Sequence, residues 1–122
     1  MFDFQIGLIK IPVTDFDKAT AYYREVIGLE EEFAVAEYGW AQYKTGNLPL
    51  CLYVVGMGGG EGTPGHEVGF HLTVNDIQAF YDQLAAHGAQ FASEIVGSAD
   101  GGQFFMLQDP DGNTFKVIHR KS

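Results

Sequence analysis

The start of the chain changes from a strand-like to a helix-like pattern at one pair of polar residues. Residues 4–13 alternate between apolar and polar side chains and are rich in β-branched residues, which predicts a β-strand. Thr14 and Asp15 then supply a helix cap, and apolar residues over 16–27 recur at helical spacing. Gly28 follows, and a glycine at this place commonly ends a helix. The pattern therefore predicts a strand followed directly by a helix.

The same order of patterns returns in the second half of the chain. Residues 68–74 alternate like a strand, and Asn75 and Asp76 provide a second cap. Apolar residues over 77–84 then form a helical stripe, which Gly88 ends. A repeated strand, cap and helix indicates that the chain is a tandem repeat.

Three further strand-like segments follow each predicted helix. They cover residues 32–37, 40–44 and 48–54 in the first half and residues 90–95, 103–107 and 114–119 in the second. The pairs Gly46-Asn47 and Gly112-Asn113, each before a final strand, are typical of hairpin turns. The predicted order is βαβββ, twice. We therefore expect an α+β fold in which tandem modules form a curved, mostly antiparallel sheet with helices packed on its outer face.

Length and composition predict one domain built from these two modules. The chain has 122 residues, of which 46% are hydrophobic and 19% are charged, as in a single globular domain. Module one spans 1–55, a glycine-rich connector spans 56–65, and module two spans 66–122. A phosphate-binding loop would need a following Lys-Ser/Thr pair or a helix, and the connector has neither. We interpret it as a flexible connector.

The charge balance excludes two classes of partner. Seven Lys and Arg residues against 16 Asp and Glu residues give a formal net charge of -9, which repels nucleic acid and anionic membrane surfaces. The opening residues lack the basic segment of a signal peptide, and polar residues interrupt their apolar run. One cysteine, Cys51, cannot form an internal disulfide. We expect a cytoplasmic protein without a nucleic-acid or membrane partner.

Strand alternation separates the residues that pack under the helices from those on the opposite face. Neighbouring strand residues point to opposite sides, so Ile11 and Val13, for example, face a helix and Lys10 does not. The opposite faces would form a cleft lined by Leu8, Lys10, Trp40, Gln42, Cys51, Tyr53, His71, Phe104, Met106 and Lys116. Aromatic side chains with a few polar groups are typical of small-molecule pockets, although the same aromatics could instead fill a dimer interface.

The polar residues of this face allow more than one chemistry. Lys10 and Lys116 suggest an anionic or carbonyl-bearing ligand, while Lys10 could also lie at the rim of the cleft or pair with a surface glutamate. His71 could be a general acid or base, or a structural residue. Cys51 could be a nucleophile if a neighbouring cation deprotonates it, or a small buried apolar residue. No catalytic residue follows from the sequence alone.

The repeat resembles the vicinal oxygen chelate superfamily, which includes glyoxalase I, extradiol dioxygenases, fosfomycin-resistance transferases and bleomycin-binding proteins. The resemblance covers nearly the whole chain and rests on the segments IPVTDFDKATAYYREVIGLE, LTVNDIQAFYDQLAAHGAQF and DPDGNTFKVI. It implies paired modules that enclose a U-shaped sheet, and chains of this length that dimerise to complete two clefts. By register, Phe104 and Met106 match apolar positions that line the pocket in family members.

The resemblance also implies a divalent metal held by His, Gln and Glu side chains, and this sequence departs from that pattern. The four ligand positions fall on Leu8, on Gly69, on Cys51 (or Leu50 without a gap), and on Lys116. Leucine and glycine side chains cannot ligate a metal, and a protonated lysine offers no lone pair. The four histidines, His66, His71, His87 and His119, are too dispersed to build another cage. We predict no metal and no other cofactor.

These observations favour metal-independent binding of a small aromatic or anionic molecule in the cleft of a homodimer, as in sequestration by bleomycin-binding relatives. The alternative is a lyase or isomerase of glyoxalase or dioxygenase type, with a non-standard active site on His71, Cys51 or Lys116 or with an unconventional metal. A third possibility is a structural or regulatory dimer whose own side chains fill the cleft.

Overall fold

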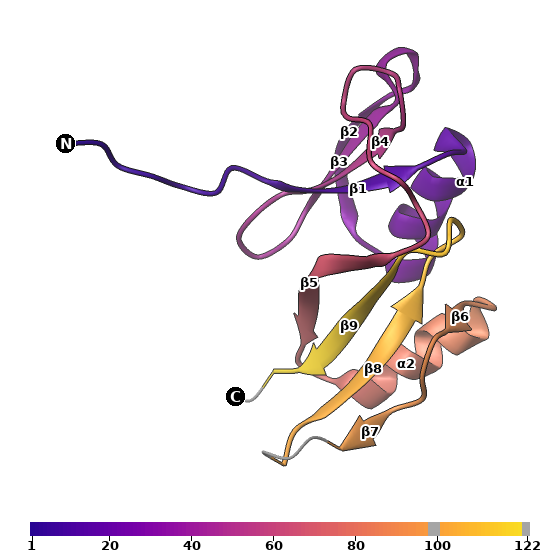
Figure 1. Cartoon of the computed structure of the whole chain (residues 1–122). Helices are drawn as coiled ribbons and strands as arrows, with labels where there is room; N and C mark the ends of the chain where they lie inside the picture. The colour runs from indigo at the N-terminus through magenta and orange to yellow at the C-terminus, as the bar shows by residue number, and fades with distance from the viewer. Residues whose placement is uncertain (98–100, 121–122) are drawn as a thin grey trace. The chain divides into compact units, whose positions relative to one another are not determined.

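A computed structural model describes residues 1–97 and 101–120 of the chain. The chain divides into two compact units, 1–64 and 65–122, each of which holds its own sheet and helix (Figure 1). Each unit follows the same plan of one strand, one helix and a run of further strands. The α+β prediction is therefore confirmed, and the predicted repeat corresponds to two separately packed sheets.

The first unit contains a mixed, mostly antiparallel sheet. Its four strands are β1 (Ile9–Val13), β2 (Glu30–Val35), β3 (Trp40–Lys44) and β4 (Leu50–Val54), arranged in the order β1-β4-β3-β2. β1 runs parallel to β4, and the other neighbours are antiparallel. The β2–β3 connection is a short 3₁₀ turn, Ala36–Tyr38, in place of the last residues of the predicted strand. β1 and β2 are the two edges of this sheet.

The helix of the first unit begins at the predicted cap and packs against β4. The Asp15 carboxylate accepts a hydrogen bond from the backbone N–H of Lys18 at 3.1 Å, and α1 (Phe16–Ala21) continues as a π-helical turn, Tyr22–Ile27. Gly28 ends it with a φ of 89°, a conformation that glycine adopts without steric cost. Of the strand residues predicted to face the helix, Ile11, Val13, Leu50 and Leu52 are fully buried, whereas Ile9 and Val54 are half-buried.

The second unit repeats this arrangement, with two short strands between its helix and its last two strands. Its strands are β5 (Glu67–Val74), β6 (Gln90–Phe91), β7 (Val96–Gly97), β8 (Gln103–Gln108) and β9 (Thr114–His119). The order is β5-β9-β8-β6, with β7 also paired to β8, and only β5 and β9 run parallel. β5 is an eight-residue edge strand.

The second helix, α2 (Ile77–Ala86), covers an aromatic core. Asp76 caps it by accepting a hydrogen bond from the backbone N–H of Ala79 at 3.0 Å. Phe105 from β8 is fully buried, and its ring lies 5.2 Å from that of Tyr81 and 5.7 Å from that of Phe91. Such edge-to-face aromatic contacts add to the stabilisation that burial provides.

Two predicted strands differ from the observed ones because strand pairing depends on a partner. Residues 4–8 alternate like a strand, but the first backbone hydrogen bond of this region is donated by Ile9 to Pro49, and the strand begins there. The segment predicted at 90–95 instead forms the separate strands β6 and β7. Between them Ser93 uses its side-chain Oγ to accept the backbone N–H of Met106 at 2.9 Å. The backbone N–H groups of Ala92 and Ser93 both donate to the Met106 carbonyl, so the pairing with β8 continues here in an irregular form.

The DPDGN segment is a buried polar turn between β8 and β9. Asp109 and Asn113 are almost fully buried. The Asp109 carboxylate accepts hydrogen bonds from the backbone N–H groups of Asp111 and Asn113, both at 2.9 Å, and from the Asn113 side-chain amide at 3.0 Å. Asn113 Oδ1 in turn accepts the backbone N–H of Gly65 at 2.9 Å. The turn therefore fixes the start of β9 and the chain entering β5.

Candidate functional site

The residues predicted to line a cleft form two groups, one on each sheet. In the first sheet the cross-strand partners Lys10, Cys51 and Gln42 form one row, and Tyr53 and Trp40 form the next. In the second sheet His71, Lys116 and Met106 form a row, and Phe104 lies in the following one, opposite Ile118. Within each unit the register thus places these residues on one face, as strand alternation predicted, whereas Leu8 precedes β1 and has no partner in the register.

The first unit contains an open apolar pocket of about 510 Å³ at one end of this face. Phe33 and Val35 line it from β2, Tyr38 from the turn and Trp40 from β3. Met57, Gly58 and Gly59 complete it from the glycine-rich segment. A pocket of this size lined by aromatic rings is suited to a flat, largely apolar small molecule.

Of the predicted site residues, Trp40 lines this pocket, whereas Tyr53 and Lys10 contact the glycine-rich segment. Tyr53 is only 5% exposed because the glycine-rich segment lies on it. Lys10 Nζ donates a hydrogen bond to the backbone carbonyl of Gly59 at 2.7 Å and stands 5.0 Å from the centre of the Tyr53 ring. The segment expected to be a flexible connector is therefore also a wall of the pocket.

Cys51 is fully buried in the middle of β4. Burial raises the pKa of its thiol to about 11, and the nearby Glu32 carboxylate acts in the same direction. Its Sγ donates to Gln42 Oε1 at 3.4 Å, and Gln42 Nε2 donates to Glu32 Oε1 at 3.5 Å. These partners stabilise a neutral thiol, whereas a cysteine nucleophile needs a thiolate.

We expect the Cys51 thiol of the folded protein to react with Ellman's reagent at pH 8 at least about a hundredfold more slowly than in urea. With the pKa raised to about 11, only about one thiol in a thousand is a thiolate at pH 8. By linkage, the neutral thiol stabilises the fold fully below the unfolded value of about 8.5, and this stabilisation is lost as pH rises toward 11. The urea-unfolded chain, with the same single thiol, is the control. Equal rates in the two states would favour the nucleophile interpretation.

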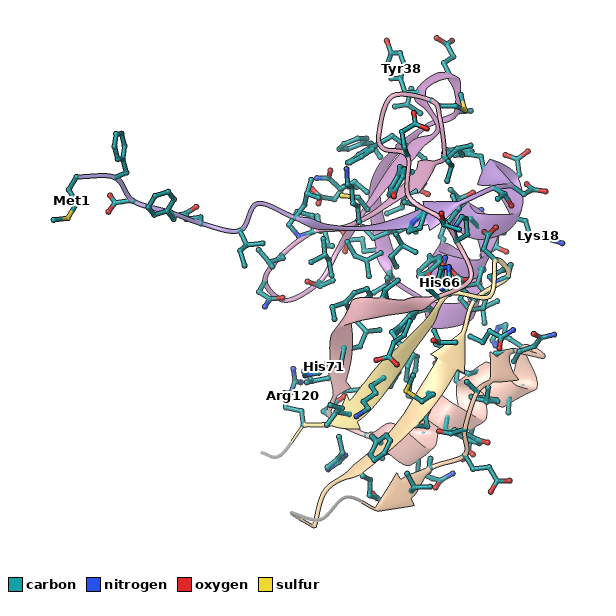
Figure 2. All side chains as sticks on the ribbon, viewed as in Figure 1. Met1, Lys18, Tyr38, His66, His71 and Arg120 are labelled. Carbon is teal, nitrogen blue, oxygen red and sulfur yellow. The ribbon has the colours of Figure 1, made fainter. Side chains whose placement is uncertain are left out.

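The second unit presents a cation and a histidine side by side. Lys116 and His71 are exposed cross-strand partners, and His71 projects from β5 (Figure 2). Lys116 Nζ lies 4.8 Å from the centre of the Phe104 ring, so the aromatic face holds the ammonium by a cation–π contact. Met106, the other cross-strand partner of Lys116, is half-buried. This face combines a positive charge with apolar surface.

The side chains at the family's metal-ligand positions do not fit a divalent cation. Leu8 and Gly69 have no donor atoms, Lys116 is engaged with an aromatic ring, and Cys51 is a buried thiol with a raised pKa. Across residues 1–97 and 101–120, no three His, Cys, Asp or Glu side chains are grouped so that they could hold a metal ion. None of the helices described is long and apolar enough to cross a membrane.

Comparison with known proteins gives a family match and several structural relatives. The family model described as the Glyoxalase/Bleomycin resistance protein/Dioxygenase superfamily matches residues 5–117. A member of that superfamily from Sphaerobacter thermophilus is 22% identical, with a TM-score of 0.84 over 97% of this chain and 98% of the other. Lactoylglutathione lyase from Agrobacterium tumefaciens is 21% identical, with a TM-score of 0.79 over 94% of this chain and 92% of that enzyme.

A third structure is a bleomycin resistance determinant encoded on the transposon Tn5. It is 25% identical, with a TM-score of 0.73 over 98% of this chain and all of the other. Among curated proteins none matches the sequence. The Sphaerobacter and Agrobacterium structures are less than 25% identical in sequence to this chain, so they establish a likeness of fold alone.

Most of the pocket was not predicted from the sequence. Phe33, Val35, Tyr38 and Met57 were not singled out, and Gly58 and Gly59 were assigned to a connector. The available signal was the β2–β3 segment, in which Phe33, Tyr38 and Trp40 lie close together in sequence around Gly39. The contact of residues 57–59 with β3 has no signature in the sequence, because it joins segments far apart in the chain.

Proposed function

We propose that this chain, which belongs to the Glyoxalase/Bleomycin resistance protein/Dioxygenase superfamily, binds a small, flat, aromatic organic molecule without a metal. The observation that carries the proposal is the apolar pocket of about 510 Å³, lined by Phe33, Tyr38 and Trp40. These rings offer stacking surfaces that require no charge on the ligand. The likeness to a bleomycin resistance determinant supports sequestration as the biological role.

The exposed face of the second unit, taken by itself, suits a separate site for an anionic small molecule. Lys116 has the Phe104 ring as its contact and takes part in none of the ion pairs of the described residues. His71 lies beside it as a second donor. We propose that an anionic or carbonyl group is bound by Lys116 and His71, with Phe104 and Met106 as apolar neighbours. Of the predicted ligand-binding residues of the first unit, Trp40 contacts the ligand directly in this proposal.

Binding is favoured over catalysis by the chemistry of the side chains. In this chain, leucine, glycine, cysteine and lysine stand at the positions that carry the metal ligands in metal-dependent relatives. The cysteine is a buried thiol with a raised pKa. The alternative enzyme is tested by measuring turnover of the methylglyoxal–glutathione hemithioacetal with added nickel or zinc. Metal-dependent turnover that a chelator abolishes would contradict the proposal.

The binding proposal is tested by titrating the wild-type protein with N-phenylnaphthylamine, an uncharged aromatic probe, and with anilinonaphthalene sulfonate, an anionic one. The chain has one tryptophan, so Trp40 fluorescence reports on the pocket alone. We expect saturable quenching of Trp40 by both probes at about one probe per chain, unaffected by a chelator. Probe binding without quenching of Trp40 would show that the pocket is not the site.

We also propose that the protein is a homodimer. The support is an N-terminal arm, residues 1–8, that extends from β1 away from the first sheet (Figure 1). Phe2, Phe4 and Ile6 on this arm are 84%, 89% and 70% exposed. Exposed apolar side chains in a row mark an interaction surface, and a strand-like arm can add to the edge of another sheet. Sedimentation equilibrium of the wild-type chain measures the assembly state.

A further inference from the structure

The glycine-rich segment is folded back onto the first sheet. We call residues 56–62 the glycine strap. The backbone N–H of Gly56 donates to the Gly60 carbonyl at 3.0 Å, and that of Met57 donates to the Val54 carbonyl at 3.2 Å, which closes a tight turn after β4. The strap then passes over the side chains of Tyr53 and Trp40. It therefore covers part of the face that strand alternation leaves open.

The contact between the strap and the two rings requires glycine. A Cβ atom at Gly59 would lie 2.7 Å from Tyr53 Cβ and 3.1 Å from Trp40 Cε3, both closer than ordinary contact distance. A Cβ at Gly62 would meet the Tyr53 hydroxyl directly. The backbone of the strap thus lies against the aromatic side chains with no room for a larger residue.

Lys10 fastens the strap from the neighbouring strand. Its ammonium donates to the Gly59 carbonyl at 2.7 Å, across 49 positions of sequence, and lies over the Tyr53 ring. None of the ion pairs of the described residues involves Lys10, although the chain has 16 carboxylate side chains. Lys10 therefore pairs with the backbone carbonyl of Gly59 and not with a surface glutamate, which was one of the partners that the sequence allowed.

We propose that Lys10 is a positioning residue that holds the glycine strap closed, and that the closed strap sets the width of the apolar pocket. The inference rests on the proposed binding function, since Met57, Gly58 and Gly59 are the strap's contribution to the pocket. A glycine-rich chain has high conformational entropy when it is free, so a fixed wall must be held by specific contacts. A wall that is already in place lowers the ordering cost of ligand binding.

The test compares Lys10→Met with Lys18→Met, which removes the same charge from an exposed position on α1, in the full chain without ligand. Acrylamide quenching of Trp40 fluorescence reports how well the strap covers the ring. We expect Lys10→Met to raise the quenching constant about twofold, and Lys18→Met to leave it unchanged. Lys10→Arg keeps a donor for the Gly59 carbonyl and is expected to restore wild-type quenching. Wild-type quenching in Lys10→Met would overturn the proposal.

A second variant moves the strap without changing Lys10. Gly59→Ala places a methyl group against Tyr53 and Trp40, whereas Gly46→Ala adds one where no atom lies within 4 Å. We expect Gly59→Ala, but not Gly46→Ala, to raise Trp40 quenching as Lys10→Met does. Unchanged quenching in Gly59→Ala would show that the strap does not cover Trp40 and would overturn the proposal.

Probe binding then separates this inference from the proposed function. We expect Lys10→Met to weaken N-phenylnaphthylamine binding about two- to tenfold, the loss expected for one hydrogen bond. If wild-type protein does not bind the probe, the proposed function fails while the quenching comparison still decides the role of Lys10. If the wild type binds and Lys10→Met binds equally tightly, the strap does not set the pocket and the inference fails alone.

Discussion

Replacing Trp40 with alanine is expected to lower the affinity for N-phenylnaphthylamine about ten- to a hundredfold. The indole ring spans the pocket between Val35, its partner on β2, and the glycine strap. Burying a large aromatic ring against a ligand contributes about 1.5–3 kcal/mol, which corresponds to that loss of affinity. Because the variant lacks tryptophan, the fluorescence of the bound probe is the measurement.

Two further variants make this result specific to the pocket. Trp40→Phe keeps an aromatic face and is expected to lose only a small part of the affinity. Val96→Ala removes an exposed apolar side chain from β7, in the other unit, and is expected to bind like wild type. If Trp40→Ala binds the probe as tightly as wild type, the pocket is not the site, and the face that carries Lys116 becomes the stronger candidate.

Local signals account for the part of the fold that was predicted correctly. Asp15 and Asp76 were identified as caps, and both carboxylates accept the backbone N–H groups that a cap should satisfy. The strand faces also follow from alternation alone, because neighbouring residues on a strand must point to opposite sides. Ile11 and Val13 are accordingly buried, whereas Lys10 is exposed, as predicted. Capping and alternation need only a few adjacent residues, so one sequence is enough to read them.

Features that depend on distant parts of the chain were not predicted. Residues 4–8 have the composition of a strand, but whether they form one depends on a neighbour with free backbone groups. Asp109 and Asn113 were read as part of a turn, whereas their burial follows from contacts with each other and with Gly65. The contact of Gly59 with Trp40 also joins segments that are far apart in the sequence, and it was not predicted. For residues 109–113 and for the glycine strap, composition predicts a loop and does not predict its contacts.

The duplication places different chemistry on equivalent positions of the two sheets. Lys10 and His71 each lie five residues before the capping aspartate, and their cross-strand partners are Cys51 and Lys116. In the first unit Lys10 is bonded to the strap and Cys51 is buried. In the second unit His71 and Lys116 are both exposed. The first sheet is thus suited to apolar contact, and the second retains groups that can bind an anion.

Replacing Phe4 with aspartate is expected to weaken the proposed homodimer about a hundredfold. Phe2, Phe4 and Ile6 are exposed apolar side chains of the arm, and the described structure records no hydrogen bond for residues 1–8. If the arm binds a second copy, its apolar side chains provide the contact area. Losing one phenylalanine from such a contact costs about 1.5–3 kcal/mol, and an aspartate in its place adds the cost of desolvating a charge. Sedimentation equilibrium gives the dissociation constants.

Gln5→Asp is the matched control, since it adds the same charge at the adjacent exposed polar residue of the arm and removes no apolar side chain. We expect it to leave the dissociation constant within about twofold of wild type, because surface substitutions away from a contact have small effects. Equal weakening by both variants would indicate a general effect of negative charge in a chain of net charge -9, with no role for the apolar side chains. A wild-type chain that sediments as a monomer would contradict the dimer itself. The two exposed phenylalanines of the arm would then indicate a partner other than a second copy, because neighbouring exposed apolar side chains mark interaction surfaces.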